Sequence, residues 1–179
     1  MKLVASLVTI AALTSAAAAD GVATGDDTAA STRAKSYVSL GATAGLEWIG
    51  SYRAAQIEVG RRISPRWWAH GSLSLGLGQD APMSTPGRYL SVRGGLEARL
   101  PLTFTHDVVR VVGGLDVGYR TLTTTDPYRD EPTVEDGVVL VPHVGLDIGT
   151  TIRFRPGIDM TLQGGISGVG ASAALAYQW

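Results

Sequence analysis

Three groups of residues have types and spacing that could do chemistry. His70-Gly71-Ser72 places an imidazole two residues before a hydroxyl, and these are the residue types of hydrolases that activate a serine nucleophile. His143 precedes Asp147 by four residues, and an imidazole can change its charge near physiological pH. The acids of Asp126–Asp136 could bind Ca²⁺ through carboxylate oxygens, although their spacing matches no EF-hand loop.

Each group also has a purely structural interpretation. His70 and His143 can serve as hydrogen-bonded interior residues, and an acidic loop is usually just solvated. The chain has no phosphate-binding glycine loop, no zinc-ligand spacing and no basic aromatic patch. It also has no cysteine, which excludes disulfide bonds and thiolate chemistry. We therefore expect no catalytic residue, no metal site and no cofactor, with a hydrolase using His70 and Ser72 as the alternative.

The beginning of the chain has the order of a secretory signal peptide. A basic start at Met1-Lys2 is followed by an apolar segment, Leu3–Leu13, and by small residues that end at Ala17-Ala18-Ala19. This order predicts cleavage after Ala19, with an uncleaved anchor as the alternative. The apolar segment of about eleven residues is too short to span a bilayer as a helix. Residues 20–36 have neither a helical nor a strand period, which predicts a flexible periplasmic leader before a domain at 37–179.

Composition limits the classes of partner and of fold. The chain has 15 basic and 16 acidic residues, so its charge does not suggest nucleic acid as a partner. About 160 residues after the signal peptide correspond to one domain. Beyond the signal peptide no stretch approaches the roughly 18 apolar residues of a membrane-spanning helix. If the protein spans a membrane, it must therefore do so as a closed barrel.

From residue 37 onward, apolar and polar residues alternate with the period of two that is typical of β-strands. Proline, glycine and two longer loops, at 79–87 and 122–136, divide this pattern into eight segments. Arg155-Pro156-Gly157 is predicted to be a tight turn. The predicted strands are residues 37–48, 52–62, 67–78, 88–100, 108–121, 137–152, 158–165 and 169–179.

Eight alternating segments predict an all-β fold, an eight-stranded antiparallel up-and-down transmembrane β-barrel. The interior of such a barrel is just wide enough for side chains to fill it. The polar face carries acids and bases in matched number, and inside a narrow barrel each charge needs a partner. Arg153 shares this face. The predicted lumen charge network is Glu47, Glu58, Arg62, Arg93, Glu97, Arg99, Arg110, Asp116, Arg120, His143, Asp147 and Asp159.

The opposite face is nearly free of charge and has aromatic residues near its ends. Aromatic side chains in two end bands are typical of the two interfaces of a membrane. A soluble β-sandwich has no reason for such bands. The predicted aromatic girdle is Trp48 and Tyr119 toward the outer side, with Trp67, Phe154, Tyr177 and Trp179 toward the inner side.

The last strand ends with Leu175, Tyr177 and Trp179 on one face. It resembles the C-terminal signal strand by which bacterial outer-membrane β-barrels are recognised for insertion. The chain from residue 37 to the end is similar to the small eight-stranded outer-membrane proteins, such as the transmembrane domain of outer membrane protein A and the outer membrane protein X group. This resemblance implies a Gram-negative outer membrane, periplasmic termini, outer-membrane lipid and the barrel-assembly machinery as partners, and a monomer.

We expect a non-enzymatic barrel whose salt-bridged lumen excludes bulk transport, and which serves envelope integrity or surface contact through loops 79–87 and 122–136. Three alternatives stay open. Some barrels of this class modify lipid A or phospholipid with His, Ser and an acid, for which His70 and Ser72 are the candidates. The chain could also be a secreted soluble calycin-like barrel with its apolar face inward, or a small pore.

Overall fold

The computed structural model describes residues 35–47, 50–79, 85–102, 105, 108–125, 132–149, 151–161 and 165–179. The predicted signal peptide and residues 20–34 of the predicted leader lie outside these ranges. The described chain forms β1 (Ser36–Glu47), β2 (Gly50–Arg62), β3 (Trp67–Gln79), β4 (Thr85–Pro101), β5 (Val109–Thr125), β6 (Pro132–Ile148), β7 (Ile152–Thr161) and β8 (Gly165–Gln178). None of the described residues belongs to a helix long and apolar enough to cross a membrane.

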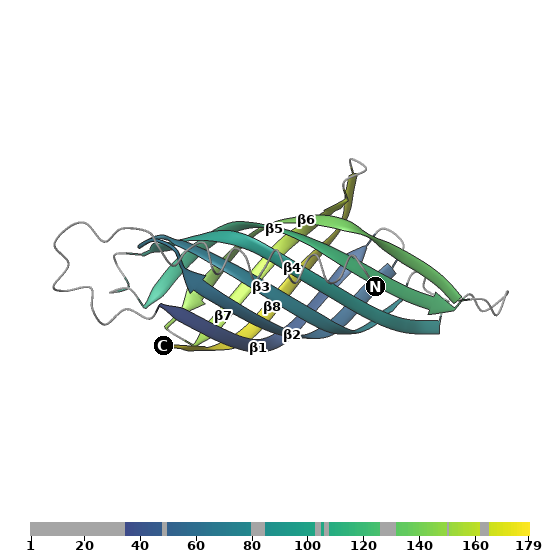
Figure 1. Ribbon diagram of the computed structural model, residues 1–179, viewed down its shortest axis with the longest axis horizontal. Coiled ribbons are helices and arrows are strands. Elements are labelled where there is room, and N and C mark those ends of the chain that lie inside the picture. The colour runs from purple at the N-terminus through teal and green to yellow at the C-terminus, as the bar shows by residue number, and fades with distance from the viewer. Residues whose placement is uncertain are drawn as a thin grey trace.

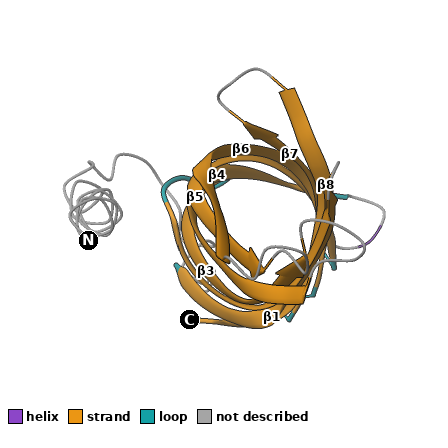
Figure 2. Ribbon diagram, turned by 90° about the vertical axis from the view of Figure 1, so that its right-hand side faces the viewer, coloured by secondary structure: helices purple, strands orange, loops and turns teal. Residues whose placement is uncertain are grey.

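The eight strands form one closed antiparallel barrel in which each strand pairs with its neighbours in the sequence (Figure 1). β8 closes the sheet against β1, with Tyr37 opposite Gln178 and Gly45 opposite Gly170. Figure 2 shows the ring that the strands enclose. Closure removes the open edges that a sheet would otherwise present. The predicted eight-stranded, antiparallel up-and-down architecture is confirmed.

The period-two alternation decides which side chains face the lumen, because successive residues of a strand point to opposite faces. In β3, Leu73, Leu75 and Leu77 point outward and are 37%, 55% and 45% exposed. Ser72 and Ser74 lie between them on the inward face and are buried. The same parity holds in the other strands and agrees with the faces predicted from the sequence.

The barrel therefore has an apolar exterior and a polar interior. Glu97 and Asp147 are among its most deeply buried side chains, whereas Val144 and Leu175 are 63% and 64% exposed. A globular soluble protein has the opposite distribution, since charged side chains are almost never fully buried there unless they are paired. A calycin-like barrel would need the apolar face inward, so that alternative is wrong.

The boundary between β6 and β7 differs from the prediction. β6 ends at Ile148, and Gly149 occupies the following turn with φ +63°, a conformation that glycine adopts without steric cost. The predicted turn at Arg155-Pro156-Gly157 lies inside β7. Proline lacks a backbone donor and sits in sheets only where pairing is incomplete. Pairing of β6 with β7 is indeed interrupted on both sides of the pair formed by His143 and Gly157.

The wall is uneven at the end of the barrel away from the described chain termini. β5 and β6 run through much of the predicted loop 122–136, and β4 begins at Thr85 within the predicted loop 79–87. β7 instead ends at Thr161, which pairs with Val139. β4, β5 and β6 therefore project beyond β7 as a three-stranded extension, visible in Figure 1. The β-branched residues Thr121 and Thr123–Thr125 favour this extended backbone.

Candidate functional site

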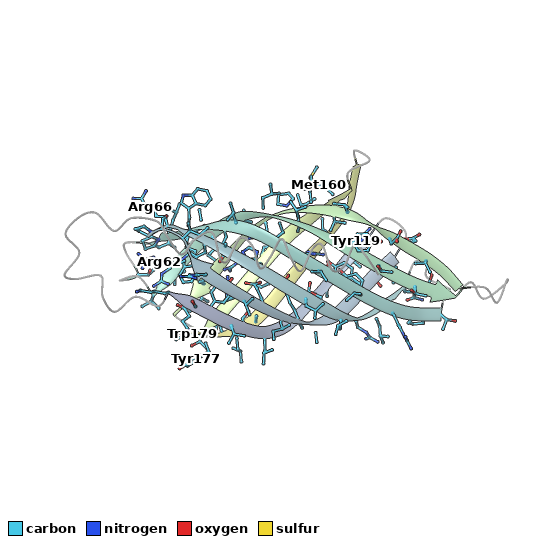
Figure 3. The ribbon with its side chains drawn as sticks, in the orientation of Figure 1. Arg62, Arg66, Tyr119, Met160, Tyr177 and Trp179 are labelled. Atoms are coloured by element: carbon cyan, nitrogen blue, oxygen red, sulfur yellow. The ribbon has the colours of Figure 1, made fainter. Side chains whose placement is uncertain are left out.

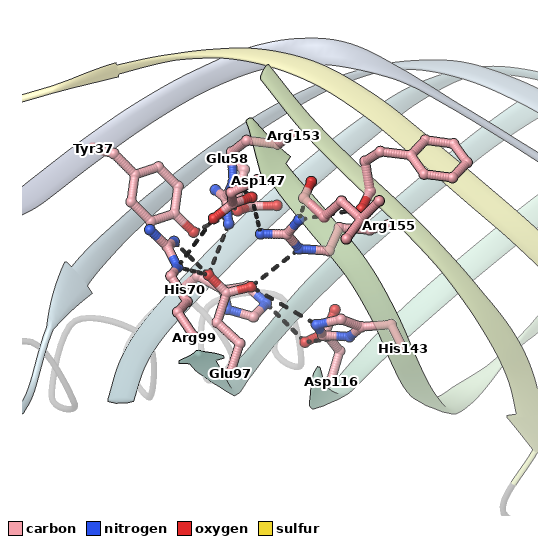
Figure 4. Close-up of polar contacts among 12 residues, drawn as sticks. Tyr37, Glu58, His70, Glu97, Arg99, Asp116, His143, Asp147, Arg153 and Arg155 are labelled. Carbon is pink, nitrogen blue, oxygen red and sulfur yellow. Dashed lines mark hydrogen bonds and ion pairs between the residues drawn. The ribbon is translucent and has the colours of Figure 1, made fainter. Parts of the chain in front are cut away.

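A network of buried charges crosses the lumen in the half nearest the described chain termini (Figure 4). Its centre is Glu97 on β4, which is 1% exposed. Glu97 Oε1 accepts hydrogen bonds from Arg99 Nε and from Arg153 Nη2, each at 2.7 Å. Glu97 Oε2 accepts a hydrogen bond from Arg155 Nε at 3.3 Å. One buried carboxylate thus joins guanidinium groups from β4 and β7.

Two further carboxylates extend the network. Asp147 Oδ1 on β6 accepts a hydrogen bond from Arg155 Nη2 at 2.6 Å and lies 3.5 Å from Arg153 Nε. Glu58 Oε1 on β2 accepts hydrogen bonds from Arg153 Nη1 and from the Tyr37 hydroxyl, each at 2.5 Å. The network therefore connects β1, β2, β4, β6 and β7 through the lumen. Buried charges of this kind are tolerated when they are paired and hydrogen-bonded.

Aromatic rings cover the guanidinium groups of the network. The Arg99 guanidinium carbon lies 4.0 Å from the centroid of the Trp68 ring and 4.8 Å from that of Tyr37. The Arg153 guanidinium carbon lies 4.0 Å from the Tyr37 centroid. Cations over aromatic faces are stabilised electrostatically, and more so where water is excluded. The two rings thus stabilise the arginines and occupy lumen volume.

A histidine pair borders the network near the middle of the barrel. His70 Nε2 lies 2.7 Å from Asp116 Oδ1 in a hydrogen bond between β3 and β5. His143 lies between two carboxylates, with Nε2 3.8 Å from Glu97 Oε2 and Nδ1 3.8 Å from Asp116 Oδ1. The two imidazole rings meet edge to face at 5.9 Å between centroids. No group of three His, Asp or Glu side chains among the described residues could hold a metal ion.

The charges of this region nearly balance. Its carboxylates are Glu58, Glu97, Asp116 and Asp147, and its guanidinium groups are Arg99, Arg153 and Arg155. The cavity beside the histidines, lined also by Gln56 and Thr43, has a volume of about 40 Å³, which is room for about two or three water molecules. The region can therefore hold water, but not a substrate the size of a lipid head group.

The other half of the lumen contains a cluster of buried aromatic and apolar side chains. The rings of Tyr52 and Tyr89 stack at 4.4 Å between centroids and 2° between planes. Ala54 and Leu122 pack with them in one buried cluster. A Cβ atom at Gly45 would overlap the Tyr52 ring, so a residue without a side chain is needed there. We call Tyr52, Ala54, Tyr89 and Leu122 the tyrosine cluster.

Only some of the predicted lumen residues belong to the charge network. Arg93 donates hydrogen bonds to the Tyr89 hydroxyl at 3.3 Å and to Ser91 Oγ at 3.1 Å, next to the tyrosine cluster. Arg62 lies at the rim, where its Nε donates to the Ser64 carbonyl at 3.2 Å. Arg110 and Arg120 are half-buried on the inward side of β5. Glu58, Glu97, Arg99, Asp116, His143 and Asp147 lie in the network, and the side chains of Glu47 and Asp159 lie outside the description.

Three members of the network were not predicted from the sequence. Arg155 was assigned to a turn, although its alternation with Arg153 around the outward Phe154 already has the period of a strand. Tyr37 and Trp68 are buried and contact arginine side chains, which the alternation of residues alone does not predict. The sequence feature that could have identified Tyr37 and Trp68 is a large aromatic residue at an inward position. In a narrow barrel such a residue must contact the charges beside it.

The described residues of the predicted aromatic girdle lie on the outward face, and Figure 3 labels Tyr119, Tyr177 and Trp179 among them. Trp67, Phe154, Tyr177 and Trp179 are 46–69% exposed near the end of the barrel that bears the described termini. Tyr119 lies toward the opposite end, where its hydroxyl donates a hydrogen bond to Asp136. Trp48 lies outside the described residues. The exposed aromatic side chains therefore lie toward the ends of the apolar exterior.

The candidate hydrolase residues both lie on the inward face of β3. His70 is engaged with Asp116, and Ser72 is buried. No hydrogen bond among the described residues joins His70 to Ser72. A serine nucleophile needs a base within hydrogen-bond reach and access to its substrate. The structure provides neither for a lipid outside the barrel.

Comparison with protein-family models and with curated proteins gave no match. Solved structures do match, among them the N-terminal β-barrel domain of Pseudomonas aeruginosa OprF, with 12% identity, TM-score 0.52 and coverage of 81% of this chain and 100% of that one. This chain has the fold of a small outer-membrane barrel. Yersinia pestis Ail matches with 14% identity and TM-score 0.52, covering 82% and 99% of the two chains. Neisserial surface protein A matches with 12% identity and TM-score 0.55, covering 79% and 94%.

Proposed function

We propose that the protein spans a bacterial outer membrane as a closed, non-enzymatic barrel that contributes to envelope integrity and surface contact. The observation that carries this proposal is that apolar side chains cover the exterior and charged side chains are buried inside, the reverse of a soluble protein. Leucine and valine side chains are exposed around the wall, whereas Glu97, Asp147 and Arg153 are buried at its centre. An apolar exterior is stable in lipid, and a closed sheet satisfies its backbone hydrogen bonds there. The fold shared with small outer-membrane barrels supports the same location.

The filled lumen supports a structural role over bulk transport. The charge network closes one half of the barrel and the tyrosine cluster closes the other. A solute would have to displace buried ion pairs from several strands at once, which costs several kcal/mol for each charge left unpaired. The protein therefore acts through its wall and its ends rather than through a channel.

Surface contact would use the extension formed by β4, β5 and β6. In the proposed orientation both chain termini lie in the periplasm, so this extension and the predicted loops 79–87 and 122–136 lie outside the cell. One structural neighbour is the attachment invasion locus protein of Yersinia pestis, which has also been solved with a heparin analogue. The β4–β6 extension is a suitable platform for contact with a molecule outside the cell.

Insertion would use the end of β8. Leu175, Tyr177 and Trp179 lie on the outward face and are 57–69% exposed. The Tyr177 and Trp179 rings stack at 5.9 Å between centroids, next to the seam with β1. These side chains are accessible to the barrel-assembly machinery before the seam closes. We propose them as its insertion signal.

The proposal is tested by the behaviour of the purified protein. A folded outer-membrane barrel should require detergent or lipid for solubility and should migrate differently on SDS gels before and after heating. A protein that stays soluble without detergent and shows no heat-dependent shift would contradict it. Incubation of the folded protein with lipid A and phospholipids should yield no hydrolysis products. Hydrolysis that disappears in His70→Ala would instead support the enzyme alternative.

A further inference from the structure

Four cationic residues gather at the rim of the barrel that bears the described chain termini. Arg61 and Arg62 end β2, Arg66 follows in the turn to β3, and Lys35 directly precedes β1. The Arg62 backbone N–H donates to the Lys35 carbonyl at 2.9 Å, so the two chain segments lie side by side. Figure 3 shows Arg62 and Arg66 at the same end as Tyr177 and Trp179. We call Lys35, Arg61, Arg62 and Arg66 the basic collar.

No Asp or Glu side chain among the described residues pairs with Lys35, Arg61 or Arg66. Lys35, Arg61 and Arg66 are exposed, and no ion pair of the described chain includes them. Arg62 is half-buried, and its Nε donates to the Ser64 carbonyl in the turn. The lumen arginines, in contrast, are matched by buried carboxylates. A concentration of unpaired like charges repels itself and attracts anions, so the collar favours a negatively charged partner.

The collar lies at the boundary of the apolar exterior. On the outward face of β2, Arg61 follows Val59, which is 55% exposed. Across the sheet, Arg61 lies opposite Ala69 and diagonal to Trp67, which is 50% exposed. Diagonal neighbours on one face are within reach of long side chains. On the other side, the Trp179 carbonyl accepts the N–H groups of Lys35 and Ser36.

This combination of residues is suited to a lipid head group. Tryptophan side chains at the ends of an apolar wall sit at the level of the membrane interface. Arginine and lysine beside them extend their apolar stems along the lipid and place the charge at the depth of the phosphates. A guanidinium group binds phosphate oxygens through charge-assisted hydrogen bonds. The partner is therefore expected to carry its negative charge at the membrane surface, next to acyl chains.

We propose that the basic collar binds the phosphate head groups of anionic phospholipids in the periplasmic leaflet of the outer membrane. Lys35, Arg61 and Arg66 contact the phosphates, and Arg62 fixes the turn through Ser64. The proposal rests on the proposed function, because it needs a membrane-spanning barrel with periplasmic termini. It adds a lipid selectivity at the end opposite the β4–β6 extension.

The test measures lipid preference of the full chain folded in phosphatidylcholine membranes. Spin-labelled phosphatidylglycerol and phosphatidylcholine are compared by the ratio of their association constants at the protein surface. We expect a preference for phosphatidylglycerol of about threefold or more at low salt, which decreases as salt is added. The variant Lys35→Gln/Arg61→Gln/Arg66→Gln should reduce the ratio to near one. Lys35→Arg/Arg61→Lys/Arg66→Lys keeps the charges and should keep the preference.

A matched control removes cations from the other end of the barrel. Arg53 and Arg88 are exposed on the outward side of β2 and β4, away from the described termini. Arg53→Gln/Arg88→Gln should retain more than half of the preference. Equal binding of both lipids by wild type, an unchanged ratio in the collar variant, or full loss in the control would each overturn the proposal.

Two further outcomes separate this proposal from others. A wild-type chain without heat-modifiable migration in phosphatidylcholine vesicles would contradict the proposed function itself, whereas a folded barrel without lipid preference contradicts only the collar proposal. Isolated peptidoglycan offers carboxylates instead of phosphates. If the protein co-sediments with peptidoglycan through the collar and shows no preference for phosphatidylglycerol, the partner of the collar is peptidoglycan and not phospholipid.

Discussion

Two side-chain clusters of different chemistry lie in the two halves of the lumen. Near the described termini, charges from β2, β4, β6 and β7 meet around Glu97. In the other half, Tyr52 and Tyr89 stack against Ala54 and Leu122. An ion network depends on every partner, because one missing group leaves the others buried and unpaired. A stack of rings loses only the contacts of the ring that is changed. The two halves should therefore respond differently to substitution.

The charge network and the tyrosine cluster also have different roles in the barrel. The network joins strands that are far apart in the sequence, since Glu58 and Arg153 are 95 residues apart. It can therefore fix the arrangement of the wall across the barrel as well as exclude solutes. The residues of the tyrosine cluster come from β2, β4 and β5 and mainly fill volume. Large side chains in both halves are accommodated by glycines on the neighbouring strand, such as Gly60 opposite Tyr37 and Gly45 opposite Tyr52.

The largest effect should follow removal of the network's centre. Glu97→Ala leaves Arg99, Arg153 and Arg155 without their shared carboxylate and should destabilise the folded barrel by about 3–5 kcal/mol. The measurement is urea unfolding in lipid vesicles, followed by heat-modifiable migration. Glu135→Gln, at a half-buried position on β6, is the control and should change stability little. Equal effects of both substitutions would remove the distinction between a carboxylate of the network and one outside it.

A new positive charge should destabilise the folded barrel less on the inward face of a strand than on the outward face. Leu75→Arg places a cation on the outward face near the middle of β3 and should cost about 2–4 kcal/mol, as expected at a membrane midplane. Ser74→Arg changes the neighbouring inward residue, which is also buried. We expect a smaller loss there, because the residues opposite Ser74 in the sheet, Gln56 and Ser91, are polar, and the buried Gln56 Oε1 could accept a hydrogen bond from the new guanidinium group. The same unfolding assay compares the two, and the reverse order would mean that the faces are assigned wrongly.

One substitution made in both halves compares them most closely. Tyr37→Phe removes a hydrogen bond to the buried Glu58 carboxylate and should cost about 1.5–3 kcal/mol, whereas Tyr89→Phe should cost about 0.5–1.5 kcal/mol. The Tyr89 hydroxyl bond to Arg93 is longer, at 3.3 Å, and the ring stack remains. Both ring volumes are preserved. Equal losses in the unfolding assay would show that the two halves are energetically alike.

Much of the fold follows from the sequence because a strand's alternation is local. The positions of Leu73, Ser74 and Leu75 are enough to decide which side of β3 faces outward. The partners inside the lumen are not local. Arg153 reaches both Glu58 and Glu97 because of the register of strands that are distant in the chain. The sequence therefore placed charges such as Glu97 and Asp147 on the inward face, but it missed Arg155 and did not show which charges pair.

The errors in the predicted strands have an identifiable cause. Arg155-Pro156-Gly157 has the composition of a turn, and only the incomplete pairing between β6 and β7 allows proline to remain in the strand. Gly149, with its positive φ, forms the actual turn. Polar Thr123–Thr125 resembled a loop, yet they extend β5 because they pair with β6. In each case a tertiary contact determines the structure at residues whose types suggest a turn or loop.

The central claim is that the lumen is closed by its own side chains in a barrel that spans a membrane. The direct test is conductance across a planar lipid bilayer after insertion of the purified, folded protein. The account predicts no steady porin-like current, because Glu97 and its arginine partners block one half and Tyr52 and Tyr89 block the other. A large, steady conductance from wild-type protein would contradict it.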